Sequence, residues 1–199
     1  MKDSYLTIKN KSSAELKLNK SKFIAQAFPF ILQSEIPELI NAVKKEYYDA
    51  SHHPFAYRAG IDENNFRFSD DGEPQGSSGK PILEAIDKFQ LTDTLVIVSR
   101  YFGGVKLGVG GLRRAMSEAA ELCLINASVI EKLITDRITI EFDYRFMNLI
   151  MNLIESEKIK IAQNLSDEKC RITLDVRLSV IEDIKIKFSE ITNGTVSFL

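Results

Sequence analysis

Hydrophobic and polar residues follow a regular pattern in the last third of the chain. Residues 137–143 alternate strictly between the two classes, which predicts a half-buried strand. Residues 145–157 carry apolar side chains at i, i+3, i+4 and i+7, the stripe of an amphipathic helix. Two further alternating segments, 159–161 and 172–178, predict strands that are joined by a polar hairpin turn over residues 164–169.

The pattern then predicts a second helix and a closing strand. The helix has an apolar stripe over residues 181–191 and ends near Asn193-Gly194, and a short strand at 196–198 follows. The order β-α-β-β-α-β is that of a ferredoxin-like unit, in which both helices cover one face of an antiparallel sheet. Residues 137–199 are therefore expected to form a ferredoxin-like domain. Its open sheet face, available to a protein partner or to solvent, is expected to display Thr139, Glu141, Asp175 and Arg177.

The first two thirds predict a separate α+β domain over residues 1–131. Strand candidates at 15–18 and 22–30 are followed by a helix with Ser34 as its N-cap and Pro37 in its first turn. The apolar stripe of this helix comprises Ile36, Leu39, Ile40, Val43 and Tyr47.

A long turn-rich segment interrupts this domain. Strands are expected at 55–61 and 65–68, and a helix is expected at 81–89. Between them, residues 69–80 are rich in Gly, Ser and Asp and predict a loop. Loops of this length inside a compact domain are usually functional.

A strand that is apolar on both faces follows, over residues 94–102. It contains the run Leu95-Val96-Ile97-Val98, which predicts a central position in its sheet. After Gly111, an apolar stripe up to Cys123 predicts a helix, and the domain boundary is expected near residues 130–136.

Composition narrows the functional classes. The 26 basic and 28 acidic residues give a net charge of −2, so no overall positive field attracts nucleic acid or acidic membranes, and any basic site must be local. The two cysteines, Cys123 and Cys170, lie in apolar periodic stretches and form neither a disulfide framework nor a zinc set. Apolar runs are far shorter than the about 20 residues that span a bilayer, so a cytoplasmic protein without a membrane segment is expected.

The densest candidate site is SRYFGGVKLGVGGLRR, residues 99–114. Here a buried strand passes through a loop of five glycines into a helix, and the segment has no acidic residue. Glycines permit close backbone approach, and a helix N-terminus offers N–H groups to an anion. A phosphate site is therefore predicted, and its alternative is a structural strand-to-helix turn. The residues that supply positive charge are Arg100, Lys106, Arg113 and Arg114.

Other candidate motifs for nucleotide or metal binding match known patterns less well. The spacing of the glycines does not match a dinucleotide fingerprint, and Pro74 and Pro81 stand where a P-loop needs Gly and Ser or Thr. Asp70, Asp71 and Glu73 offer oxygen ligands for a hard cation, but solvated loop carboxylates are commoner, so neither a metal nor a cofactor is expected. The adjacent His52 and His53 point to opposite faces of an extended segment.

Three segments together resemble the YigZ/IMPACT family. They are DASHHPFAYRAG (49–60), FSDDGEPQGSSGKP (68–81) and VSRYFGGVKLGVGGLRRA (98–115). The resemblance implies an N-terminal domain similar to ribonuclease PH and to the second domain of a small-subunit ribosomal protein. It also implies a C-terminal domain similar to the last domain of elongation factor G, in agreement with the pattern of residues 137–199.

The resemblance implies RNA or ribosome binding and a role in translation regulation through a translation-factor or regulatory protein partner. The first hypothesis is therefore a non-enzymatic RNA- or ribosome-associated protein that binds phosphate groups through the loop 103–111. Its expected binding residues are Arg58, His52, His53, Lys80, Arg100, Gly103, Gly104, Lys106, Gly110, Gly111, Arg113 and Arg114.

The alternative is an enzyme that acts on a phosphorylated small molecule or a nucleotide at the same loop. Asp70, Asp71 and Glu73 would then supply acid/base groups or metal ligands. Leu112-Arg113-Arg114-Ala115 stands where kinases of this fold class have a Ser-rich loop, which argues against kinase chemistry.

Overall fold

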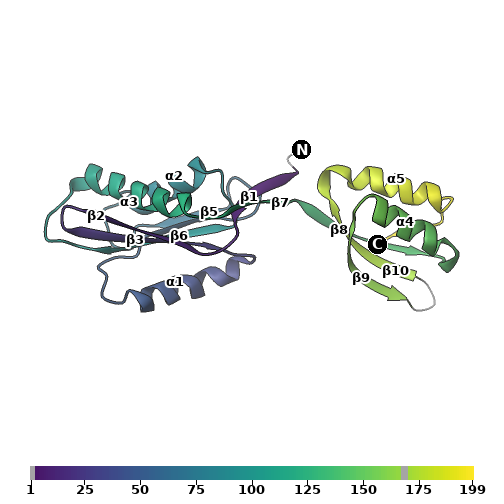
Figure 1. Cartoon of the computed structure of the whole chain (residues 1–199), viewed down its shortest axis with the longest axis horizontal. Helices are drawn as coiled ribbons and strands as arrows, with labels where there is room; N and C mark the ends of the chain where they lie inside the picture. Colours follow the sequence, from purple (N-terminus) through teal and green to yellow (C-terminus); the bar gives the residue numbers. More distant parts are fainter. Residues whose placement is uncertain (1–2, 167–169) are drawn as a thin grey trace. The chain divides into compact units, whose positions relative to one another are not determined.

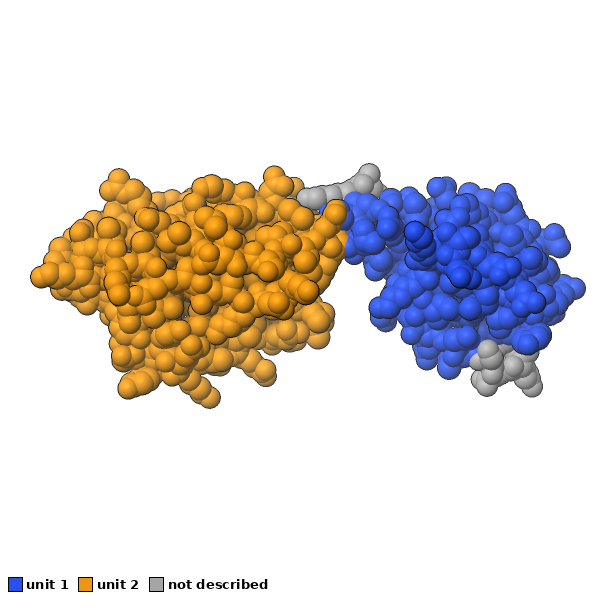
Figure 2. All heavy atoms as spheres, viewed as in Figure 1, with its two compact units in different colours: residues 1–4, 133–199 blue, residues 5–132 orange. Residues whose placement is uncertain are grey.

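The computed structural model describes residues 3–166 and 170–199, and the chain divides into two compact units (Figure 2). The larger unit comprises Tyr5–Lys132. The smaller unit comprises Leu133–Leu199 together with the residues that precede Tyr5. Each unit has its own sheet and its own hydrophobic core.

The larger unit is built on a five-stranded antiparallel sheet in the order β2-β3-β6-β4-β5. The central position predicted for the apolar strand is confirmed, because β6 lies third in this order. The strands are β2 (Ser12–Leu18), β3 (Ser21–Pro29), β4 (Phe55–Arg58), β5 (Phe66–Ser69) and β6 (Thr94–Tyr101).

Three helices cover the two faces of this sheet unequally (Figure 1). Helix α1 (Ile36–Glu46) lies on one face, and α2 (Gly79–Lys88) and α3 (Gly108–Ile125) lie on the other. The side chains of β6 belong to the apolar clusters on both faces of the sheet. Val96 and Val98 pack toward α2 and α3, whereas Leu95 and Ile97 pack toward α1. A strand between two helical layers must be apolar on both faces, which explains the run Leu95–Val98.

A second, two-stranded sheet joins the ends of the larger unit. Strand β1 (Ser4–Ile8) pairs with β7 (Val129–Leu133), and neither strand was expected from the sequence pattern. Ile8 at the end of β1 is fully buried in the core between the sheet and α3.

The smaller unit has the predicted order β-α-β-β-α-β. Its four strands are arranged β11-β8-β10-β9 and are antiparallel, and both helices cover one face (Figure 1), as a ferredoxin-like fold requires. The elements are β8 (Thr135–Phe142), the 3-10 turn η2 (Tyr144–Phe146), α4 (Met147–Ser156), β9 (Lys160–Ser166), β10 (Cys170–Arg177), η3 (Leu178–Val180), α5 (Ile181–Ile191) and β11 (Ser197–Phe198).

Polar pairs between β8 and β10 cover the other face of this sheet. The Arg137 guanidinium lies 3.1 Å from the Asp175 carboxylate, the hydroxyls of Thr139 and Thr173 are 3.0 Å apart, and Arg171 lies 2.8 Å from Glu141. Cross-strand pairs of this kind contribute to sheet stability. This pairing supports a solvated face more than a docking surface.

Several element boundaries differ from the sequence prediction. Ser34 is not the N-cap of α1, because it lies inside the 3-10 turn η1 (Gln33–Glu35), where the Glu35 carboxylate accepts the Leu32 N–H. Helix α2 begins two residues earlier than expected, at Gly79. In the predicted turn over 164–169, residues up to Ser166 belong to β9, and 167–169 lie outside the described residues.

Among the described residues, no helix combines the length and the apolar character that a membrane crossing requires.

The double packing of β6 yields a prediction about stability. Replacing the fully buried Ile97 by Ala should lower the free energy of unfolding by about 2–5 kcal/mol, because it removes apolar contacts and leaves a cavity under α1. Urea denaturation measures this change. The matched control is Ile125→Ala at the exposed end of α3, where a change within about 0.5 kcal/mol is expected. Equal effects at the two sites would contradict the assignment of β6 to the core.

Candidate functional site

The glycine-rich loop leaves the end of the central strand between two neighbouring segments. On one side, the Ser51 N–H donates to the Arg100 carbonyl at 2.8 Å, and the Phe102 N–H donates to the Ser51 hydroxyl at 3.2 Å. On the other side, the Gly103 N–H donates to the Ser21 hydroxyl at 3.1 Å. The start of the loop is therefore fixed by backbone contacts to both neighbours.

Gly103 is required by a close backbone approach. A Cβ atom at this position would lie 2.1 Å from the carbonyl carbon of Lys20, a distance that no side chain tolerates. Asn19 and Lys20 form the two-residue turn between β2 and β3, and both have positive φ, 46° and 66°. Such turns match the twist of a hairpin. The turn places the backbone of Lys20 directly beside the glycine-rich loop.

Two lysines that the sequence pattern did not indicate, Lys20 and Lys22, lie at this turn beside the glycine-rich loop. Lys20 is exposed, and the Lys22 ammonium lies 4.2 Å from the centre of the Tyr101 ring. The available signal was the pair Asn19-Lys20 between two strand candidates, which predicts a tight hairpin. What the sequence did not show is that the second strand of this hairpin pairs with β6.

The N-terminus of α3 has no side-chain cap. Leu107 occupies the N-cap position, and within residues 3–166 and 170–199 no side-chain hydrogen bond caps the helix there. The N–H groups of that turn and the helix dipole favour a negatively charged group at this end. Lys106 and Arg114 flank this turn and are exposed, and neither forms an ion pair within residues 3–166 and 170–199.

The N-terminus of α2, in contrast, is satisfied from within the chain. The Asp70 carboxylate accepts hydrogen bonds from the backbone N–H groups of Gly76 at 2.7 Å, Ser78 at 2.9 Å and Gly79 at 2.8 Å. One carboxylate thus closes the loop 70–79 and neutralises the positive end of the helix dipole. The two glycine-rich helix starts therefore differ: Asp70 caps that of α2, whereas no such cap occurs at α3 among the described residues.

Glu73 and Arg100 form a buried ion pair. Their charged groups are 2.5 Å apart, and each side chain is less than 10% exposed. The Arg100 guanidinium also lies 5.7 Å from the ring centre of Phe23 and 5.5 Å from that of Phe102. Arg100 therefore holds the loop 70–79 against β6 through its ion pair with Glu73.

Asp71 links the same loop to the histidine pair. Its carboxylate accepts the His53 N–H at 2.7 Å and lies 2.8 Å from the Lys44 ammonium, while its carbonyl contacts Nδ1 of His52 at 2.8 Å. Burial alone raises the pKa of Asp71, but the hydrogen bonds from Lys44 and His53 hold this pKa below its usual value. The imidazole of His53 is buried and contacts the Ser99 hydroxyl at 3.0 Å.

The remaining residues of the predicted site lie in different places and have different partners. Arg113 bridges the two loops, because its guanidinium donates to the Gly76 carbonyl at 2.6 Å and pairs with Glu84 at 3.1 Å. Lys80 is exposed in the first turn of α2.

Arg58 lies far from the glycine-rich loop. It pairs with Asp87 and lies opposite Thr94 at the start of β6, whereas the loop follows the end of β6. At about 3.3 Å per residue along β6, the backbone of Arg58 is roughly 20 Å from the start of the loop.

The acidic residues of the loop all have internal partners. Asp70 binds backbone N–H groups, Asp71 binds Lys44 and His53, and Glu73 binds Arg100. No group of three His, Cys, Asp or Glu side chains suited to a metal ion occurs in the described parts of the chain. This geometry gives the hypothesis of an acidic catalytic centre no support.

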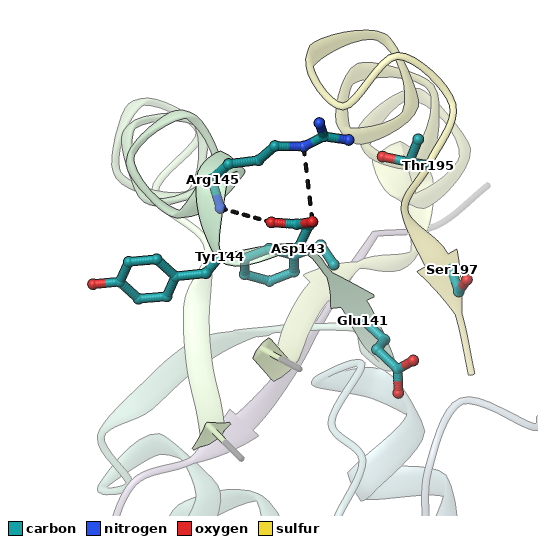
Figure 3. Close-up of a pocket in the computed structure, with 7 residues that line it drawn as sticks. Glu141, Asp143, Tyr144, Arg145, Thr195 and Ser197 are labelled. Carbon is teal, nitrogen blue, oxygen red and sulfur yellow. Dashed lines mark hydrogen bonds and ion pairs between the residues drawn. The ribbon is translucent and has the colours of Figure 1, made fainter. Parts of the chain in front are cut away.

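The smaller unit has a polar pocket of about 320 Å³ between the end of β8 and the segment that precedes β11. Figure 3 shows Arg145 extending across it toward Thr195, with the Asp143 carboxylate beneath. Asp143 accepts the Arg145 N–H at 3.0 Å and lies 3.9 Å from the Arg145 side chain (Figure 3). These charges are paired with each other, in keeping with a role in capping η2.

Comparison with known proteins identifies the family. Residues 19–124, which include the hairpin turn, both loops and most of α3, match the model of the Impact N-terminal domain. The chain belongs to the IMPACT family. The recognition from the three sequence segments is confirmed.

Relatives of this IMPACT-family chain differ in how much they share with it. The Bacillus subtilis protein "IMPACT family member YvyE" is 31% identical over 98% of this chain and 89% of its own length. "IMPACT family member YigZ" of Escherichia coli is 28% identical over 92% of this chain and 90% of its length. "Protein IMPACT" of Xenopus laevis is 32% identical over only 45% of this chain and 30% of its length.

A solved structure, described as the crystal structure of a hypothetical protein, has the same fold. It covers 100% of this chain with a TM-score of 0.76 at 25% sequence identity. The predicted α+β class is confirmed.

Burial of His53 predicts a dependence of stability on pH. Burial lowers the pKa of His53 below its ordinary value of 6.5, although the Asp71 carboxylate acts in the opposite direction and Lys44 and His52 act in the same direction as burial. The unfolded chain therefore takes up a proton at a higher pH than the folded chain does. The free energy of unfolding should be fully maintained above about pH 6.5 and should decrease as the pH falls below that value.

Urea denaturation between pH 7.5 and 5 tests this expectation. In His53→Gln, the decrease should be shallower than in the parent, because the titrating group is absent. The titration of Asp71 lies below its usual pKa of 3.8 and thus outside this range. Parallel profiles for parent and variant would rule out His53 as the cause.

Substitution by Ala is expected to have opposite effects on the stability of the larger unit at two glycines of the loop. Gly103→Ala should strongly destabilise the larger unit, because the new methyl group meets the backbone of Lys20. Gly110→Ala should stabilise it by about 0.5–1 kcal/mol, because this position is in the first turn of α3 and has open space around it. Thermal denaturation of both variants measures the difference. A tolerated Gly103→Ala would show that the turn and the loop are not in contact.

Proposed function

We propose that this protein is a non-enzymatic, RNA- or ribosome-associated regulator of translation in the cytoplasm. RNA phosphates would bind at the open N-terminus of α3 and at the cations around it. The observation that carries the proposal is the contrast between the two helix starts: Asp70 occupies that of α2, whereas that of α3 is uncapped. We name the surface formed by the following residues the α3 basic surface: Lys20, Lys22, Lys106, Gly110, Gly111 and Arg114.

The basic residues of the region fall into two groups. Arg100 and Arg113 have carboxylate partners, so they position the loops. Lys106 and Arg114 are exposed and have no carboxylate partner within the described residues. Unpaired cations beside a helix N-terminus suit phosphate groups, because no internal ion pair has to be broken on binding.

Exposed aromatic residues favour RNA over a free phosphate group. Phe102 is 48% exposed at the start of the glycine-rich loop, and the Tyr101 hydroxyl donates to Asp49 beside the exposed Tyr48. Burial and the Asp49 carboxylate raise the pKa of Tyr101 to about 12, so its ring stays neutral. Aromatic rings next to lysines are the stacking platforms of proteins that bind single-stranded nucleic acid.

Membership of the IMPACT family supports a role in translation at the level of the family. The net charge of −2 argues against strong non-specific binding of nucleic acid, so the expected partner is a defined RNA or ribosomal site. The acidic residues that an enzyme would use have internal partners, and we therefore do not propose an enzymatic function.

The test is the salt dependence of binding to single-stranded RNA. The double variant Lys106→Gln/Arg114→Gln should bind more weakly and should reduce the magnitude of the slope of log K against log salt concentration by about 1.4, because each of the two lost phosphate contacts contributes about 0.7. Fluorescence anisotropy with a labelled oligonucleotide, repeated with purified ribosomes, measures both quantities.

The matched control is Lys9→Gln/Lys45→Gln, which removes the same charge from exposed positions outside the α3 basic surface. This control should keep the parent slope. If both double variants lose affinity equally, the binding is a general charge effect and the proposed surface is wrong. If the slope is unchanged in both double variants, Lys106 and Arg114 do not contact phosphate groups and the proposed surface is also wrong.

A further inference from the structure

The face of the large sheet that carries α1 is only partly covered. Five strands at about 4.8 Å spacing are roughly 19 Å across, whereas a single helix with its side chains is about 10–12 Å wide. Helix α1 contacts the central strand β6. The part of this face formed by β4 and β5 therefore lies beside the helix, and Figure 1 shows no second helix on this face.

A groove of about 380 Å³ occupies this position. Its apolar lining comes from Phe55 and Tyr57 of β4 and from Ile36, Pro37 and Ile40 of α1. The Phe30 ring meets that of Tyr57 edge to face, with centroids 6.1 Å apart, which fixes the orientation of Tyr57. The volume is within the range of small-molecule sites, which combine an apolar lining with a few polar groups.

Among the residues that line the groove, Arg67 is the charged one, and its charge is positive. Arg67 of β5 lies opposite Tyr57 in the sheet register, is exposed, and forms no ion pair within the described residues. The other polar lining residues are the amides Gln33 and Asn41, and no lining residue is acidic. The side-chain N–H of Gln33 donates to the Asn65 side chain at 2.8 Å, which ties η1 to the turn between β4 and β5.

Arg58 of the same hairpin provides an internal comparison. It projects from the opposite face, toward α2, where it is paired with Asp87. Within the part of the chain that the structure describes, the hairpin thus has one arginine with an ion-pair partner, Arg58, and one without, Arg67, and Arg67 is at the groove. A guanidinium offers two parallel N–H donors, which match the two oxygens of a carboxylate.

We propose that the groove between α1 and the β4–β5 hairpin binds a small aromatic carboxylate. The flat ring lies against Tyr57 and Ile40, and the carboxylate pairs with Arg67. This site is separate from the α3 basic surface and does not depend on the proposed RNA-binding function.

Titration of the ¹⁵N-labelled full-length protein with naphthalene-2-carboxylate, followed by NMR, tests the proposal. We expect saturable shifts of the backbone amides of Ile40, Tyr57 and Arg67. The neutral isostere naphthalene-2-carboxamide should bind at least about tenfold more weakly, because it lacks the charge-assisted pair. Arg67→Gln should reduce the affinity for the acid to that for the amide, while Lys45→Gln, on the exposed side of α1, should leave both affinities unchanged.

A second variant tests the groove independently of the charge. Asn41→Trp places a large ring at the rim and should abolish binding of both compounds, while the exposed position should leave the fold intact. Four outcomes would overturn the proposal: no saturable shifts at millimolar concentration, shifts located away from the groove, equal affinities for acid and amide, or unchanged binding by either groove variant.

Discussion

The buried ion pair between Glu73 and Arg100 is the constraint on which the arrangement of the larger unit's loops depends. Arg100 lies near the end of the central strand, and Glu73 lies in a loop 27 residues earlier in the chain, so the pair fixes this loop at the end of the sheet. Both side chains are almost fully buried, and removal of one partner would leave the other as an unpaired buried charge, at a cost of about 3–5 kcal/mol. The pair therefore specifies one loop conformation.

Charged residues near the glycine-rich loop have two separate roles as a result. Asp70, Glu73, Arg100 and Arg113 form a rigid internal frame, because each is bound to a backbone group or to an opposite charge. Lys106 and Arg114 lie outside this frame and face solvent. A binding surface that rests on such a frame does not need to order its loops when a ligand arrives, which lowers the entropic cost of binding.

The sequence predicted what depends on local periodicity, and it did not predict what depends on distant pairing. The run Leu95–Val98 identified a central strand, and alternation over 137–143 and 172–178 identified the ferredoxin-like unit, because burial imposes these patterns directly. Sequence alone did not show that Arg100 has a partner at Glu73, that Lys20 lies beside Gly103, or that Arg58 lies far from the loop. Each of these facts follows from strand register, which no local pattern encodes.

The pairing of β1 with β7 has a consequence for how the protein folds during synthesis. Roughly 120 residues separate the two strands, so β1 leaves the ribosome about 6–25 s before its partner, at the usual elongation rates of about 5–20 residues per second. The smaller unit, in contrast, is built almost entirely from a continuous stretch of chain. Strand β1 thus remains without β7 until the end of the larger unit has been translated, and an earlier contact available to it is the hydrogen bond from the Thr92 N–H to the Leu6 carbonyl.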